Sequence, residues 1–158
     1  MKAVIIYYSY QGNSVLVADT IRDAIHADSF EIKTVDRKKR KGFAMYAWGG
    51  AQVIFGKRPR LEPLSVDLDA YDLVILGTPV WAGSPAPAVL SFLDKAKPNG
   101  KKIALFCCHG GGMGDALKKL KAHLSGNTIV SEMDFVYPLK NQGDELKQKI
   151  SGWAKTLV

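Results

Sequence analysis

The sequence predicts one α/β domain, residues 1–158, in which helices cover both faces of an open parallel β-sheet. Two patterns point to this fold class. Five short apolar runs have the composition of buried strands, and the segments that follow them repeat apolar residues at helical spacing. A length of 158 residues with 47% hydrophobic content is also typical of one globular domain. Alternating strands and helices favour parallel strands joined by crossover helices.

The first half of the chain predicts two strands and two helices. Residues 2–8 are a continuous Val/Ile/Tyr run, as expected for a strand buried on both faces. Residues 12–27 carry apolar side chains three and four positions apart, which predicts a helix. Residues 30–35 alternate as a second strand. Residues 37–70 form the irregular part of the chain, and a short helix is expected there over residues 43–55.

The next part repeats the strand and helix pattern twice. Residues 71–77 (YDLVILG) predict a buried strand, and residues 86–96 predict a helix with its apolar residues facing inward. Residues 101–108 (KKIALFCC) predict another buried strand. A helix follows, in which Leu117, Leu120 and Leu124 share one side.

The last strand and helix complete the predicted sheet. Residues 128–137 form the fifth strand, which Pro138 ends because proline has no N–H to donate. Leu146, Ile150, Trp153 and Leu157 then follow the spacing of one helix face. The chain contains no internal repeat and no low-complexity tract. We therefore expect five strands with a helix after each.

The positive charge is confined to one segment. The formal net charge is +7, and residues 37–60 contain eight basic residues without any acidic one. The rest of the chain has 14 basic and 15 acidic residues and is nearly neutral. A local excess of this kind indicates an anionic partner. We call these eight residues the basic segment: Arg37, Lys38, Lys39, Arg40, Lys41, Lys57, Arg58 and Arg60.

Several features predict a cytoplasmic protein that does not span a membrane. The longest apolar runs are too short to cross a bilayer. The apolar run after Lys2 continues into a Gly/Ser turn without a cleavage pattern, so we expect no signal peptide. Cys107 and Cys108 are adjacent and form no disulfide framework. No group of His, Cys and acidic residues has the spacing of metal ligands, and neither Gly-Lys pair continues into the Ser/Thr of an ATP-binding loop.

The loop after the first strand is the first candidate site. Ligands of open α/β sheets bind at the carboxyl ends of the strands. This loop offers hydroxyls, side-chain amides and backbone N–H groups at a helix start, and its glycine allows tight folding around a ligand. It contains no Lys or Arg, so neutral dipoles would hold a bound phosphate. The loop residues are Ser9, Tyr10, Gln11, Gly12, Asn13 and Ser14.

These residues resemble the Ser/Thr-x-x-Gly-Asn-Thr/Ser phosphate loop of flavodoxin-like proteins, which bind FMN. Residues 71–92 resemble the third strand, flavin-ring loop and following helix of that family, and residues 101–114 resemble its fourth strand and second ring loop. The resemblance implies a flavodoxin-like three-layer sandwich of the short-chain type, with strand order 2-1-3-4-5. It implies FMN as the cofactor. The basic charge differs from the acidic charge of familiar electron-carrier flavodoxins, which implies a different partner.

The two expected ring loops have chemistry that suits a flavin. Trp81 could stack on the isoalloxazine, and Gly83 could let a peptide reorient at its edge. His109 could bind the pyrimidine edge, relay a proton to a substrate, or be a solvated loop residue, and Cys108 is more typical of a small core residue than of a nucleophile. The expected cofactor-binding residues here are Thr78, Pro79, Val80, Trp81, Ala82, Gly83, Cys108, His109, Gly110, Gly111, Gly112 and Gly114.

The leading function hypothesis is FMN-dependent electron transfer between redox proteins. One alternative is an FMN-dependent NAD(P)H:quinone-type reductase, since the glycine-rich loop leaves room over the ring. A second is a flavodoxin fold used as a non-catalytic binding module. The basic segment is interpreted as a docking face for an acidic redox protein, with a solvated surface as the plain alternative and nucleic acid as the reading with least support. The aromatic residues of the 41–55 stretch face either the core or a flavin-side pocket.

Overall fold

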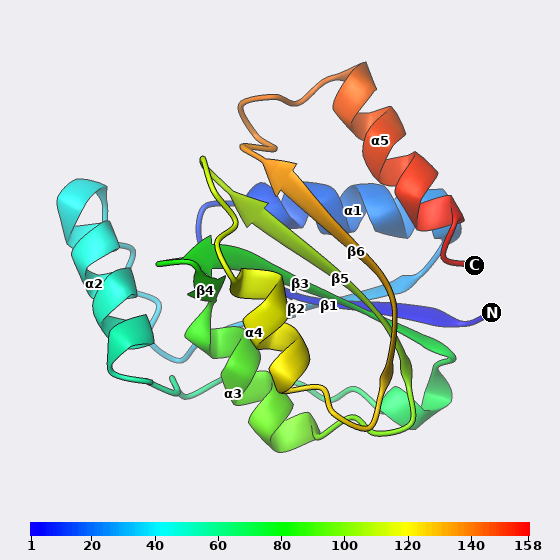
Figure 1. Ribbon diagram of the computed structural model, residues 1–158, viewed down its shortest axis with the longest axis horizontal. Coiled ribbons are helices and arrows are strands. Elements are labelled where there is room, and N and C mark those ends of the chain that lie inside the picture. The colour runs from blue at the N-terminus through cyan, green and yellow to red at the C-terminus, as the bar shows by residue number, and fades with distance from the viewer.

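Parallel pairing of five strands builds the sheet, as the computed structural model of residues 1–158 shows (Figure 1). The order is β2-β1-β3-β5-β6, which is the predicted 2-1-3-4-5 order once the short β4 is set aside. The elements in chain order are β1 (Ala3–Tyr8), α1 (Asn13–Ile25), β2 (Asp28–Ile32), α2 (Gly42–Ile54), η1 (Leu68–Ala70), β3 (Leu73–Trp81), β4 (Ser84–Pro85), α3 (Pro87–Ala96), β5 (Lys102–His109), α4 (Ala116–Ala122), β6 (Thr128–Val136) and α5 (Asp144–Lys155).

Alternating strand residues divide the core into two layers, one on each face of the sheet. On β1, Ile6 belongs to the layer that includes α3 and α4, and Ile5 belongs to the layer that includes α1 and α5. Both side chains are fully buried. Figure 1 shows α3 and α4 on one side of the sheet and α1 with α5 on the other. The predicted three-layer α/β class is therefore confirmed.

The ends of two strands differ from those expected, because hydrogen-bonded pairing with neighbouring segments decides where each strand ends. β2 ends at Ile32, opposite Tyr8, because Thr34 turns away and forms an isolated bridge with Leu61. β3 continues to Trp81, because β4 supplies an antiparallel partner for its last residues and adds a sixth strand. No helix of the protein is both long and apolar enough to cross a membrane.

The segment 37–70 is only partly irregular. It contains α2, close to the expected helix over residues 43–55, and the short helix η1. Gly49 is the one buried residue of α2. Figure 1 shows α2 apart from the other helices, at the edge of the molecule where β3 ends. This position is next to the carboxyl ends of the strands, where the candidate site lies.

Candidate functional site

A cavity of about 430 Å³ opens where the loops after β1, β3 and β5 meet. Twelve of the residues expected in the site line it: Ser9, Tyr10, Gln11, Asn13, Ser14, Pro79, Val80, Trp81, Ala82, Cys108, His109 and Gly110. Five further lining residues were not among them: Met45, Tyr46, Gly49, Gly50 and Tyr137. Its volume lies within the range of about 300–1,000 Å³ that is usual for small-molecule sites.

The other six expected residues do not line the cavity, and four of them shape the loops around it. Gly12 begins α1 with a φ of 98°, and the Thr78 hydroxyl accepts a 2.9 Å hydrogen bond from Ala86 N. A Cβ on Gly114 would come within 2.8 Å of Gly83 Cα, so these two glycines let the loops after β3 and β5 touch. The remaining two, Gly111 and Gly112, are exposed.

The first turn of α1 is well prepared for an anion. Gly12 precedes the helix at the capping position and has no side chain to cap it, and the first turn carries no acidic residue. Its first backbone N–H groups have no partner inside the helix, and the helix dipole makes this end positive. Ser9 Oγ accepts a 3.1 Å hydrogen bond from Gly12 N, which folds the loop back toward the helix start.

Ser14 gives the clearest sign that this loop fits a ligand. Its hydroxyl is buried and has no oxygen or nitrogen partner in the protein; the Cys108 thiol, a weak hydrogen-bond group, is its neighbour. A buried polar group without a partner costs about 1–3 kcal/mol, so such groups are rare in native proteins. Asn13 differs, because its Oδ1 accepts a 3.0 Å hydrogen bond from Leu139 N and ties α1 to the chain after β6. The residues present therefore fit a phosphate-bearing cofactor at this turn.

Aromatic side chains form one wall of the cavity. Trp81 lies at the centre, with ring centroids 5.9 Å from Tyr8, 5.7 Å from Tyr10 and 5.4 Å from Trp48. All three pairs are edge-to-face, an arrangement that aromatic rings favour. Gly49 brings α2 against the Trp81 ring, since a Cβ there would lie 3.4 Å from it. The part of Trp81 that lines the cavity remains available to a planar ligand.

The sequence around the α2 residues and Tyr137 gave little indication that they line the cavity. The aromatic 41–55 stretch suggested either a core or a pocket position, and the structure places Met45 and Tyr46 on the pocket. Tyr137 packs on Gly110, where a Cβ would come within 2.6 Å of the tyrosine ring. That contact joins two loops that no sequence spacing relates.

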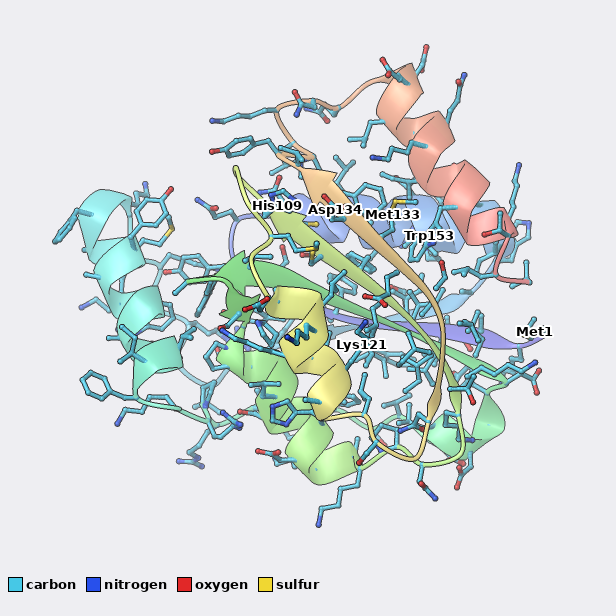
Figure 2. The ribbon with its side chains drawn as sticks, in the orientation of Figure 1. Met1, His109, Lys121, Met133, Asp134 and Trp153 are labelled. Carbon is cyan, nitrogen blue, oxygen red and sulfur yellow. The ribbon has the colours of Figure 1, made fainter.

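His109 is held by the protein on both ring nitrogens. Its Nε2 is 2.9 Å from Asp134 Oδ2 on β6 (Figure 2). Its Nδ1 accepts a long 3.4 Å hydrogen bond from Gly111 N. This pattern corresponds to a neutral ring that carries its proton on Nε2. The side chain is 8% exposed. A proton relay through His109 would require one of these contacts to break.

The cysteine pair, Cys107 and Cys108, is buried and unreactive in character. Burial raises the pKa of each thiol to about 12, and the neighbouring Ser14 hydroxyl acts in the opposite direction at Cys108. Because the thiolate is the reactive form, neither thiol is an activated nucleophile. Cys108 thus contacts the cavity as a small apolar side chain.

Half of the basic segment is engaged within the protein. Ion pairs join Arg37 to Glu62, Arg40 to Asp36 and Arg58 to Asp94. Lys39 Nζ lies 4.3 Å from the centre of the Tyr10 ring and donates to the Tyr10 carbonyl, so it is engaged as well. The other four side chains have neither a carboxylate partner nor an aromatic ring beneath them, and we call them the unpaired cations: Lys38, Lys41, Lys57 and Arg60.

Comparison with protein families identifies the chain. The family model described as NADPH-dependent FMN reductase matches residues 1–142. The chain belongs to this family. The prediction of a flavodoxin-like FMN-binding protein is therefore confirmed, and FMN is the cofactor. A comparison with curated proteins finds no match.

Several solved structures have the same fold as this chain. A flavoprotein from Lactobacillus acidophilus NCFM, solved in complex with FMN, is 22% identical with a TM-score of 0.75, over 88% of this chain and 96% of that one. A putative flavoprotein from Bacteroides eggerthii DSM 20697 is 18% identical with a TM-score of 0.80, over 98% and 96%. Oxidised flavodoxin 2 from Bacillus cereus is 20% identical with a TM-score of 0.62, over 98% and 96%.

Proposed function

We propose that the cavity at the ends of β1, β3 and β5 holds FMN, and that the protein carries electrons between redox partners. The observation that carries the proposal is the buried hydroxyl of Ser14, which lacks an oxygen or nitrogen partner in the protein at an uncapped helix start. A phosphate there would accept hydrogen bonds from that hydroxyl and from the free N–H groups of the first turn of α1. Bound there, FMN would supply transfer of electrons singly or in pairs.

In this proposal the protein binds, orients and shields the cofactor. The loop of residues 9–14 holds the phosphate, and Trp81 provides an apolar surface for the ring. The loop at His109–Gly110 also borders the cavity, and the contacts of His109 with Asp134 and Gly111 hold it in place. Met45 and Tyr46 of α2 line the cavity as well. Together these groups limit the access of water to the ring.

The character of the lining groups favours an electron carrier. Both nitrogens of His109 have protein partners, and burial keeps the Cys108 thiol protonated. The Tyr10 hydroxyl is engaged with the backbone of the basic segment, since it accepts a 2.6 Å hydrogen bond from Arg40 N. These three groups are therefore not free to exchange a proton, which quinone reduction would use and electron transfer does not need. The hydroxyls of Tyr46 and Tyr137 are the other titratable groups of the lining.

The alternative is an NAD(P)H:quinone-type reductase, and the match to NADPH-dependent FMN reductases favours it. Two measurements distinguish the candidates. FMN titrated into cofactor-free protein, followed by flavin absorbance and then by stepwise reduction, tests the cofactor site itself. Steady NADPH consumption with a quinone acceptor would identify a reductase, and its absence from an FMN-loaded protein is expected of a carrier. Protein that takes up no FMN would leave the fold as a binding module.

We further propose that the redox partner is acidic and docks on the basic segment. The support is the local charge, since residues 37–60 have eight basic and no acidic side chains. The unpaired cations are the part of the segment most available to a partner. A cytoplasmic location is also proposed, because the cysteine pair is buried in the reduced form and suits a reducing compartment.

A further inference from the structure

Helix α2 presents apolar side chains to solvent. Phe43 is 87% exposed, Ile54 76%, Phe55 74% and Tyr46 72%. A surface helix normally turns its apolar face to the core and its polar face to water. No residue from Gly42 to Gly56 is charged, and Gly49 is the only buried residue of the helix. The outward face of α2 is therefore an exposed apolar patch of the kind that marks an interaction site.

Cations flank this patch at both ends of the helix. Lys38 and Lys41 precede α2, while Lys57 and Arg60 follow it, and none of the four has a carboxylate partner. The remaining charges of the basic segment are already paired or packed on Tyr10. An apolar centre without charge, surrounded by a charged rim, is the usual composition of a protein interface.

The charges also indicate what covers the patch. A second copy of this chain would bring another acid-free basic segment against the first, and like charges facing one another oppose association. A partner with carboxylates around an apolar centre matches both parts of the surface. The position of the helix adds a reason for a redox protein, because Met45 and Tyr46 of α2 line the cavity. A partner seated on α2 would lie beside that cavity.

We infer that the outward face of α2 is the centre of a docking surface for an acidic redox protein, with the unpaired cations as its rim. This inference rests on the proposed function, since it places the partner beside bound FMN. It assigns different tasks to the two parts of the surface. The rim steers the partner during approach, an effect that salt screens, and the apolar centre keeps the docked partner in place. Removing either part therefore leaves a different kinetic signature.

Stopped-flow reduction of the FMN-loaded protein by a reduced plant-type [2Fe–2S] ferredoxin tests the inference. Two ferredoxins each lose one electron, and one FMN gains both, with protons taken from solvent. The variant Phe43→Gln/Ile54→Gln, called the centre variant, removes the two most exposed of the four apolar side chains of the patch, keeps good helix formers on an exposed helix, and changes no cavity residue. The variant Lys41→Glu/Lys57→Glu reverses two rim charges.

The centre variant should react about tenfold more slowly at low salt, the loss expected when central interface residues are truncated. The loss should persist at about 1 M salt, where the screening length is only ~3 Å. The rim variant should be at least about tenfold slower at low salt and approach the wild-type rate at high salt. Matched controls are Val130→Thr on β6 and Lys147→Glu/Lys155→Glu on α5, both exposed sites on other elements, and both should react like wild type.

Three results would overturn the inference. The first is a centre variant that reacts at the wild-type rate at both salt concentrations. The second is loss of a dimer in the centre variant by light scattering, which would show that a second copy covers α2. The third is binding to phosphatidylglycerol vesicles that the centre variant loses while its ferredoxin rate is unchanged. FMN titration of the same samples distinguishes failure of the proposed function from failure of the docking surface. Protein that does not bind FMN refutes the proposed function. Normal FMN binding together with any of the three results refutes only the docking surface.

Discussion

Replacing Ser14 with alanine is expected to weaken FMN binding while making the FMN-free protein more stable. The hydroxyl is buried and has no partner, so its removal should raise the free energy of unfolding of the FMN-free protein by about 1 kcal/mol. With FMN bound, the same substitution removes a hydrogen bond to a charged phosphate, worth about 1.5–3 kcal/mol. FMN affinity should therefore fall about tenfold to a hundredfold. Riboflavin has no phosphate, and its affinity should be nearly unchanged.

Ser91 provides a matched control for this experiment. It is the other buried serine whose hydroxyl has no partner, and it lies on α3 and not on the cavity. Ser91→Ala should give a similar small gain in stability and no change in FMN affinity. Calorimetric titration with FMN and riboflavin, together with urea unfolding of the FMN-free proteins, measures all four quantities. Equal losses for FMN and riboflavin in Ser14→Ala, or a less stable FMN-free protein, would refute the assignment of phosphate to this turn.

Three other expectations concern the frame around the cavity. Asp134→Ala should remove the Nε2 partner of His109 and shift the ring away from the Nε2-protonated tautomer, which ¹H–¹⁵N NMR detects. It should also lower FMN affinity by about 1 kcal/mol, or roughly fivefold. An unchanged tautomer would contradict this expectation. Above pH 9.0 the thiols of the cysteine pair ionise in the unfolded chain but stay protonated in the folded one, where the pKa of each is about 12. The free energy of unfolding should therefore fall with rising pH by up to about 1.4 kcal/mol per pH unit for each thiol. A free energy of unfolding in urea that does not change across this range would contradict the expectation. Gly77→Ala should destabilise the protein by about 1–3 kcal/mol, because its Cβ would lie 2.1 Å from Phe106, whereas Gly152→Ala on α5 meets open space and should be neutral or stabilising in thermal unfolding.

Much of the fold follows from local patterns in the sequence. A strand buried on both faces must be apolar throughout, and a helix that covers one face must be apolar every three or four residues, so both leave a readable period. The runs at residues 2–8 and 101–108 predicted β1 and β5, and the polar loop at residues 9–14 indicated where a phosphate-binding turn would lie. The cofactor followed from the resemblance of three ordered motifs, because the residues that line such a site come directly after predictable strands.

The tertiary structure decided which distant residues meet at the cavity. His109 finds Asp134 only because β5 and β6 pair in a register that places Cys107 opposite Asp134, and 25 residues separate the two partners in sequence. Likewise, the charge count of the basic segment could not show that Arg37, Arg40 and Arg58 are paired. Sequence periodicity records which face of an element is buried, whereas contacts between elements depend on strand order and register, which arise only when the whole sheet assembles.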